Sequence, residues 1–449
     1  MNSWIEECIF YHIYPLGFCG APENNDMTSA PKPRLNRIKE WIPHLKSLEI
    51  NALYLGPVFE STSHGYDTID YFKVDRRLGT NDTLKEISNV LHKNGINLIL
   101  DGVFNHVGRN FPKFKDLILN KQNSKYTSWF SGINFNNNTE YNDGFSYDSW
   151  NGYYNLVKLN TYNQDVKNYI FEIIEFWIKE FNIDGIRLDA ADCLDLNFLK
   201  ELSHYSRTLK PDILLLGEII HGDYARWANN DCLDTVTNYE CYKGLYSSHN
   251  SLNYFEIAYS LNRQFGNGGI YKNIPLYNFV DNHDVNRIAS TLTDLDNIYP
   301  LYALLFTMPG VPSIYYGSEF GIKGSKKNGS DAELRPKITL DDFNSSEDSQ
   351  KLLKFIQLIS KIRIASKALK KGSYNQIFIS NKQYAFLRNF EDENIITAAN
   401  CSRENSEIKF KIDGKSLLDL ISKETFNIKN NTVTLPIGKN KARILKLQK

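Results

Sequence analysis

The stretch DGIRLDAADCLDLNFLKELSHYSRTLKPDILLLGEII (184–220) decides the fold of this chain. It opens with a short apolar run, DGIRLDA (184–190), and closes with another, ILLLGEII (213–220). A helical segment between two such runs is typical of a strand, a crossover helix and a second, parallel strand. The last residues of both runs include an acid, Asp189 in the first and Glu218 in the second.

The same unit recurs on both sides of this stretch, and eight strands alternating with helices predict an α/β fold with a parallel sheet covered on both faces. A (β/α)8 TIM barrel uses about 30 residues per unit, and Glu218 follows Asp189 by 29 residues. The eight runs are CIFYHIYP (8–15), NALYLGPV (51–58), INLILDGVF (96–104), DGIRLDA (184–190), ILLLGEII (213–220), DTVTN (234–238), LYNFVDN (276–282) and VPSIYYG (311–317). One helical stripe is formed by Val166, Tyr169, Ile170, Ile173, Trp177 and Phe181.

Two segments fall outside the repeating unit. Arg187 follows Asp101 by 86 residues, more than one barrel unit supplies, and residues 107–160 are rich in Asn, Tyr, Gly and Ser with no long helical stripe. After a helix near 347–368, short alternating runs are typical of an antiparallel β-sandwich. The predicted domains are a barrel (1–106 and 161–368), a small irregular domain B inserted after the third strand (107–160), and a C-terminal β-sandwich (369–449).

Composition narrows the class of partner. The 449 residues carry 52 Lys+Arg and 52 Asp+Glu, so no net field attracts nucleic acid or an anionic membrane. No segment approaches 18 consecutive apolar residues, and the acidic N-terminus MNSWIEECIFYHIYPLG lacks the features of a signal peptide. With six scattered cysteines, this predicts a cytoplasmic protein with reduced thiols. The 13% aromatic content suits stacking on sugars, although a large aromatic core explains most of it.

Acidic residues gather where four of the predicted strands end, the edge at which barrel enzymes carry their active sites. A single acid there is more often a helix cap or a turn residue, but four acidic ends at barrel spacing favour an active site. The four strings are DGVFNHVG (101–108), GIRLDAAD (185–192), LLLGEII (214–220) and FVDNHD (279–284).

Glycoside hydrolysis needs two carboxylates beside the scissile bond. Asp189 and Glu218 close neighbouring strands, so we expect them on one rim at the short separation of a retaining mechanism. The apolar LLLG before Glu218 predicts a raised pKa, suited to a general acid. By the two-residue period, Arg187 points to the same side as Asp189 and should keep it ionised.

Together these four strings resemble the signature regions of the α-amylase family of retaining glycosidases. The resemblance implies Asp189 as nucleophile, Glu218 as acid/base and Asp284 as the third acid, which holds sugar hydroxyls in the transition state. It also implies that Arg187, His106 and His283 hydrogen-bond the nucleophile or the sugar at the cleavage subsite. Asp101 resembles the acid that braces the arginine, and Asn105 resembles a domain-B anchor that also ligates calcium in many relatives.

Shorter strings resemble one group of that family, the neopullulanases, cyclomaltodextrinases and maltogenic amylases. KLNT (158–161) resembles its domain-B motif. DAELR (331–335) resembles the group's Asp and Arg that bind the sugar next to the cleavage subsite, which would be Asp331 and Arg335 here; a surface helical ion pair is the alternative. SHGYD (63–67) places Tyr66 where the family stacks a tyrosine on the sugar; an edge-strand aromatic is the alternative.

Some features depart from that group. Its usual N-terminal β-domain is missing before the first predicted strand, so we do not expect a closed dimer, and the oligomeric state stays open. Asn282 is larger than the group's usual residue, and Ile220 stands where an aromatic is usual, so a preference for cyclic or branched glucans does not carry over. No dense run of oxygen ligands is present, so no cofactor is expected to be required, with calcium left open at Asn105.

Three other functions compete with hydrolysis of α-glucosidic bonds in maltooligosaccharides, cyclodextrins or related glucans. A transglycosylase would use the same site with a sugar acceptor in place of water. A non-catalytic carbohydrate-binding or interaction scaffold should have lost at least one of the three acids, yet all are present. A phosphate-dependent enzyme is disfavoured because no Gly-rich phosphate loop occurs.

Overall fold

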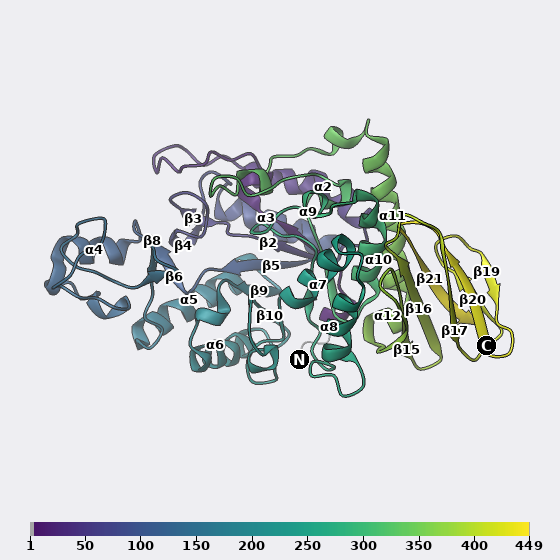
Figure 1. The fold of residues 1–449 in the computed structure, drawn as a ribbon. Helices are drawn as coiled ribbons and strands as arrows, with labels where there is room; N and C mark the ends of the chain where they lie inside the picture. The colour runs from purple at the N-terminus through teal and green to yellow at the C-terminus, as the bar shows by residue number, and fades with distance from the viewer. Residues whose placement is uncertain (1–3, 449) are drawn as a thin grey trace. The chain divides into compact units, whose positions relative to one another are not determined.

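The computed structural model describes residues 4–448, in which eight short strands form one sheet in the order β11-β10-β9-β5-β2-β1-β13-β12. An isolated parallel bridge between Thr237 and Tyr277 brings the sheet close to closure. Every predicted run therefore contains a strand, and the (β/α)8 barrel is confirmed (Figure 1). The strands are β1 (Phe10–Ile13), β2 (Ala52–Leu55), β5 (Asn97–Gly102), β9 (Gly185–Leu188), β10 (Leu214–Gly217), β11 (Thr235–Val236), β12 (Tyr277–Asn278) and β13 (Val311–Tyr315).

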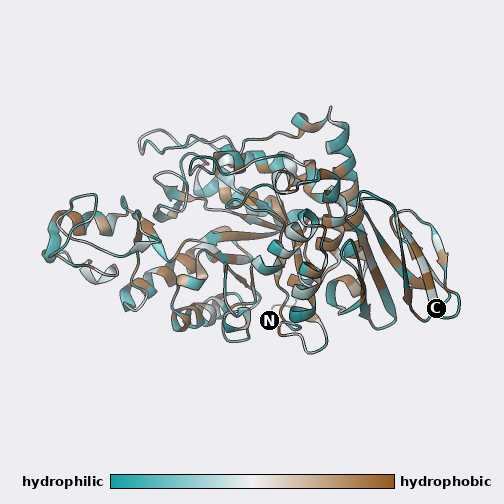
Figure 2. Cartoon of the chain, viewed as in Figure 1, coloured by the Kyte–Doolittle hydropathy of each residue, from teal (hydrophilic) through white to brown (hydrophobic). Residues whose placement is uncertain are grey.

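Helices separate these strands along the chain. Figure 2 shows hydrophobic residues concentrated on the strands, whereas the helices carry both hydrophobic and hydrophilic residues. This is the pattern expected of helices that cover a sheet with one face. The helices are α1 (Pro15–Phe18), α2 (Arg37–Ser47), α3 (Asn81–Lys93), α5 (Gln164–Phe181), α6 (Leu196–Leu209), α7 (Tyr239–Asn250), α8 (Phe255–Phe265), α9 (Ile288–Thr291), α10 (Ile298–Thr307), α11 (Glu347–Ala365) and α12 (Lys367–Lys371).

Helix α5 shows how sequence sets these elements. Its N-cap is Asn163, whose side chain accepts hydrogen bonds from the backbone N–H groups of Asp165 and Val166. The helix ends at Phe181, and the next residue, Asn182, adopts the left-handed conformation common after helices. The predicted stripe is buried along its length except for Tyr169, and Trp177 donates a 2.8 Å hydrogen bond to the carbonyl of Tyr71 on β4 (Thr68–Val74).

The chain forms two compact units, and their limits differ from the predicted domains. The first unit comprises Ile13–Ile42 and Ala52–Val236 and holds β2, β5, β9, β10 and β11. The second comprises 4–12, 43–51 and 237–448 and holds β12, β13 and most of β1. The domain boundaries at 106/107, 160/161 and 368/369 stay a prediction. The candidate residues from Tyr66 to Glu218 lie in the first unit, and those from His283 to Arg335 in the second.

The inserted segment is more regular than its composition suggested. It contains the nine-residue helix α4 (Pro112–Asn120) and an antiparallel sheet in the order β6-β8-β7. The strands are β6 (His106–Gly108), β7 (Ser149–Trp150) and β8 (Tyr153–Lys158). The expectation of a wholly irregular subdomain is therefore wrong, because a short helix and two- to six-residue strands leave too little periodicity to read.

The C-terminal strands form a six-stranded antiparallel sheet, β14-β15-β16-β21-β18-β19, and a two-stranded sheet, β17-β20. Buried residues of both sheets, among them Ile396, Leu445, Ile408 and Leu435, share one hydrophobic core, which confirms an antiparallel β-domain. The strands are β14 (Ser373–Ile379), β15 (Gln383–Phe390), β16 (Glu393–Asn400), β17 (Ser406–Lys411), β18 (Ser416–Asp419), β19 (Thr425–Asn427), β20 (Thr432–Ile437) and β21 (Lys441–Gln448). Within 4–448, none of the helices combines the length and the apolar character needed to cross a bilayer.

Candidate active site

Three strand ends in the first unit place acidic side chains in register. On β5 and β9, Asp101 is paired with Arg187. On β9 and β10, Leu188 is paired with Gly217, so the next residues, Asp189 and Glu218, leave the two strands side by side. The backbone N–H of Glu218 donates to the carbonyl of Leu188 at 3.0 Å, which continues the ladder to this point.

The guanidinium of Arg187 connects all three carboxylates. Its Nη1 lies 2.8 Å from Asp101 Oδ1 and 2.9 Å from Asp189 Oδ1, and its Nη2 lies 2.9 Å from Glu218 Oε2. Burial alone would lower the pKa of Arg187, but Asp101 and Glu218 raise it well above its usual value. The arginine is therefore a permanent cation held among three acids.

Asp101 also contacts two tyrosines. Its Oδ2 accepts hydrogen bonds from the hydroxyls of Tyr54 on β2, at 2.7 Å, and Tyr66, at 3.2 Å. Tyr66 lies in the loop between β3 (Phe59–Ser61) and β4, so the alternative of an edge-strand aromatic is wrong. Sequence reasoning missed Tyr54, although it lies in the predicted run NALYLGPV (51–58), near the end of strand β2.

Glu218 also receives a backbone donor. The N–H of Ala190 donates to Glu218 Oε2 at 3.0 Å, and Ala190 adopts the left-handed conformation, with φ 44° and ψ 45°. This conformation is rare for residues other than glycine. The apolar setting predicted for Glu218 is wrong for its carboxylate, because the Arg187 guanidinium and the Ala190 amide both reach Oε2.

The first unit also positions His106 and Asn105. His106 Nε2 lies 3.9 Å from Asp189 Oδ2, and its Nδ1 is 3.2 Å from the side-chain amide of Asn105. Burial lowers the pKa of His106 to about 3, so the ring is neutral. The carbonyl of Asn105 accepts from the N–H of Leu159 at the end of the inserted segment.

Calcium binding at Asn105 stays a prediction. The Asn105 side chain is buried and its amide nitrogen faces a histidine ring nitrogen, not a carboxylate. In the described part of the chain no three His, Cys, Asp or Glu side chains come together as metal ligands.

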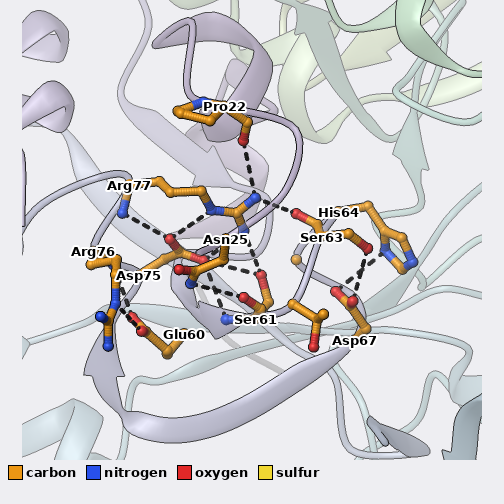
Figure 3. A network of polar contacts seen from close by, with 12 residues as sticks. Pro22, Asn25, Glu60, Ser61, Ser63, His64, Asp67, Asp75, Arg76 and Arg77 are labelled. Carbon is orange, nitrogen blue, oxygen red and sulfur yellow. Dashed lines mark hydrogen bonds and ion pairs between the residues drawn. The ribbon is translucent and has the colours of Figure 1, made fainter. Parts of the chain in front are cut away.

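A polar network holds the loop that carries Tyr66 (Figure 3). The buried guanidinium of Arg77 donates to both carboxylate oxygens of Asp75, to the Ser61 hydroxyl and to the Ser63 carbonyl. Asp75 also accepts from the Ser61 backbone N–H. Arg77 thus fixes both ends of the turn before Tyr66, a role that its isolated position in the sequence did not signal.

The remaining candidates lie in the second unit. Asp284 has two nitrogen-bearing neighbours: its Oδ1 is 2.9 Å from Arg335 Nη2, and its Oδ2 is 2.9 Å from His283 Nε2. Arg335 Nη2 also lies 2.9 Å from Asp331 Oδ2, and Arg335 Nε donates to the His283 carbonyl. A short 3-10 helix, Ala332–Leu334, separates Asp331 from Arg335, and the ion pair of the alternative interpretation is present; sugar binding by these two residues stays a prediction.

Two family models match most of the chain. The family model "Alpha amylase, catalytic domain" matches residues 12–367, and "Maltogenic Amylase, C-terminal domain" matches residues 374–439. A cyclomaltodextrinase of a Bacillus species is 32% identical over 419 residues, which cover 89% of this chain and 73% of that protein.

Solved structures give the same result. A cyclomaltodextrinase with 29% identity has a TM-score of 0.89, covering 100% of this chain and 79% of its own. The cyclic α-maltosyl-(1→6)-maltose hydrolase of Arthrobacter globiformis, in complex with cyclic α-maltosyl-(1→6)-maltose, has 25% identity and a TM-score of 0.84 over 99% of both chains. Because the catalytic model matches most of its length, the chain belongs to the α-amylase family, and its C-terminal part belongs with the C-terminal domains of maltogenic amylases.

Proposed function

We propose that this protein is a retaining hydrolase of α-glucosidic bonds, mainly α-1,4, in maltooligosaccharides, cyclodextrins or related α-glucans. One observation carries the proposal: Asp189 and Glu218 directly follow paired residues of adjacent parallel strands and share the guanidinium of Arg187. Neighbouring strands lie about 4.8 Å apart. A retaining pair of carboxyls is separated by about 5–5.5 Å, whereas an inverting pair must leave room for a water.

In the first step, Asp189 attacks the anomeric carbon while Glu218 gives its proton to the departing glycosidic oxygen. The bond between that oxygen and the anomeric carbon breaks, and a glycosyl ester of Asp189 forms. Arg187 and the Ala190 amide are both donors to Glu218 Oε2 and hold this carboxylate in place for proton transfer. The same guanidinium orients the attacking carboxylate through Asp189 Oδ1.

In the second step, Glu218 removes a proton from water, the water oxygen bonds to the anomeric carbon, and the ester to Asp189 breaks. Two inversions give net retention of the α-configuration. Asp284 is proposed as the third acid, favouring the distorted sugar ring, with His106 and His283 binding sugar hydroxyls and Tyr66 stacking on the ring. Asp331 and Arg335 are proposed to bind the neighbouring sugar.

Product analysis tests this function. The purified protein, incubated with maltotriose, cyclodextrin, pullulan and starch, should release shorter sugars whose first detectable anomer by NMR is α. Transfer products at high maltose concentration would instead favour a transglycosylase, and a β-anomer would overturn retention. Asp189→Ala should abolish hydrolysis with folding intact by circular dichroism, whereas Asp192→Ala, the loss of an exposed acid three residues on, should not.

We also propose that the protein works in the cytoplasm. All six cysteines are free, and five of them are buried. Unpaired thiols are the rule in a reducing compartment, whereas oxidising compartments favour disulfides. Alkylation of the unfolded protein isolated directly from cells should modify six thiols without prior reduction.

A further inference from the structure

The hairpin of β7 and β8 presents two aromatic rings on one face. Trp150 and Tyr153 are paired across the strands and flank the two-residue turn Asn151–Gly152. Both turn residues have positive φ, 47° and 81°, as a type I′ hairpin requires. This turn fixes the register, so the two side chains share one face of the hairpin without ordering a flexible loop.

These rings continue a row that begins beside Asp189. The His106 ring, 2% exposed, lies 5.9 Å from the Trp150 ring at a tilt of 39°. The Trp150 ring in turn stacks on Tyr153, at 5.9 Å and 23°. Along this row the side chains pass from buried at His106 through half-buried at Trp150 to 59% exposed at Tyr153.

We propose that Trp150 and Tyr153 form a platform that binds a glucosyl unit of the α-glucan outside the unit being cleaved. This inference rests on the proposed function and adds a binding site to it. Trp150 covers one face of the Tyr153 ring, and the exposure of Tyr153 leaves the remainder of that ring to solvent. An exposed aromatic ring held in a fixed orientation by a second ring suits the apolar C–H face of a sugar. Because the row of rings begins at His106, beside the proposed nucleophile Asp189, we infer that the platform binds another part of the same substrate chain.

Chain-length dependence tests the platform. Tyr153→Ala should raise the KM for maltohexaose by about 5- to 10-fold and leave kcat unchanged, because the contact binds ground and transition states equally. The KM for p-nitrophenyl α-glucoside, which has one glucosyl unit, should not change. Tyr153→Phe keeps the ring and should restore the wild-type KM. Tyr259→Ala is the matched control, since it removes a 68% exposed tyrosine from helix α8.

An unchanged KM for maltohexaose in Tyr153→Ala, or an equal rise for both substrates, would overturn the platform while leaving the hydrolase intact. A wild-type protein without activity on any α-glucan would overturn the proposed function instead. Calorimetric titration with maltohexaose then decides the inference separately: weaker binding by Tyr153→Ala than by the wild type supports it, and equal or absent binding refutes it.

Discussion

Arg187 Nη2 lies 2.9 Å from Glu218 Oε2, although the sequence pairs this arginine with Asp189, two residues away on its own strand. The link crosses from β9 to β10 and joins the two proposed catalytic carboxylates through one planar group. Because the guanidinium is rigid, a shift of one carboxylate is resisted by the contact with the other.

Replacing Arg187 with Lys tests this link. The lysine keeps a positive charge but not the planar fork, so it cannot contact Asp101, Asp189 and Glu218 in this geometry. We expect kcat to fall by about 10²-fold or more while the substrate KM changes little. Arg187→Met should in addition lower the free energy of unfolding by about 3–5 kcal/mol, since it leaves buried acids unpaired. Wild-type kcat in Arg187→Lys would show that the fork is dispensable.

The Asp284 cluster predicts a different ranking. Arg335 touches Asp284 directly, whereas Asp331 reaches it only through Arg335. Arg335→Ala should therefore lower kcat and raise KM, and Asp331→Ala should mainly raise KM, as measured by steady-state kinetics on maltotriose. Lys327→Ala, which removes an exposed partner of Glu333 in the same loop, is the control and should match the wild type. The reverse ranking of Asp331 and Arg335 would contradict the arrangement.

Much of the barrel was readable because most of its strands lie in compact apolar runs bounded by polar residues or glycine. The acids were readable for the same reason: Asp101, Asp189 and Glu218 close such runs at barrel spacing. Strands β18 and β19 of the C-terminal sheet have four and three residues, too short to show alternation in the sequence. The environment of Glu218 was misjudged because its donors come from Arg187 on another strand and from a backbone amide. Neither contact can be predicted from the residues next to Glu218 in the sequence.

The role of Arg77 also depends on contacts that its neighbouring residues in the sequence do not predict, and it leads to a prediction about stability. Its buried ion pair with Asp75 joins residues two apart, yet its function is to hold the loop that carries Tyr66. Arg77→Met should lower the free energy of unfolding by about 3–5 kcal/mol in urea titrations, because Asp75 is left buried without its cation.

Two controls separate this effect from a general loss of charge. Lys73→Ala, which removes a 47% exposed side chain 3.9 Å from Glu60, should change stability by less than about 0.5 kcal/mol. Combining Arg77→Met with Asp75→Asn should cost less than the sum of the single changes, as expected when two groups interact. Additive losses would mean that Arg77 and Asp75 stabilise the loop independently.

The neutral His106 predicts how stability depends on pH. Burial lowers its pKa to about 3, whereas the pKa of a histidine in an unfolded chain is about 6.5. Between these pH values the unfolded chain binds a proton at His106 that the folded chain does not bind. The contribution of His106 to the free energy of unfolding is therefore complete above about pH 6.5 and falls as the pH drops towards 3. His106→Gln should flatten the pH dependence measured by urea titrations across that range, by a few kcal/mol in total. His204→Asn, the loss of an exposed imidazole, should leave the wild-type slope. Parallel curves for His106→Gln and the wild type would show that the pKa of His106 is the same in the folded and unfolded protein, and would contradict a neutral His106 ring over this range.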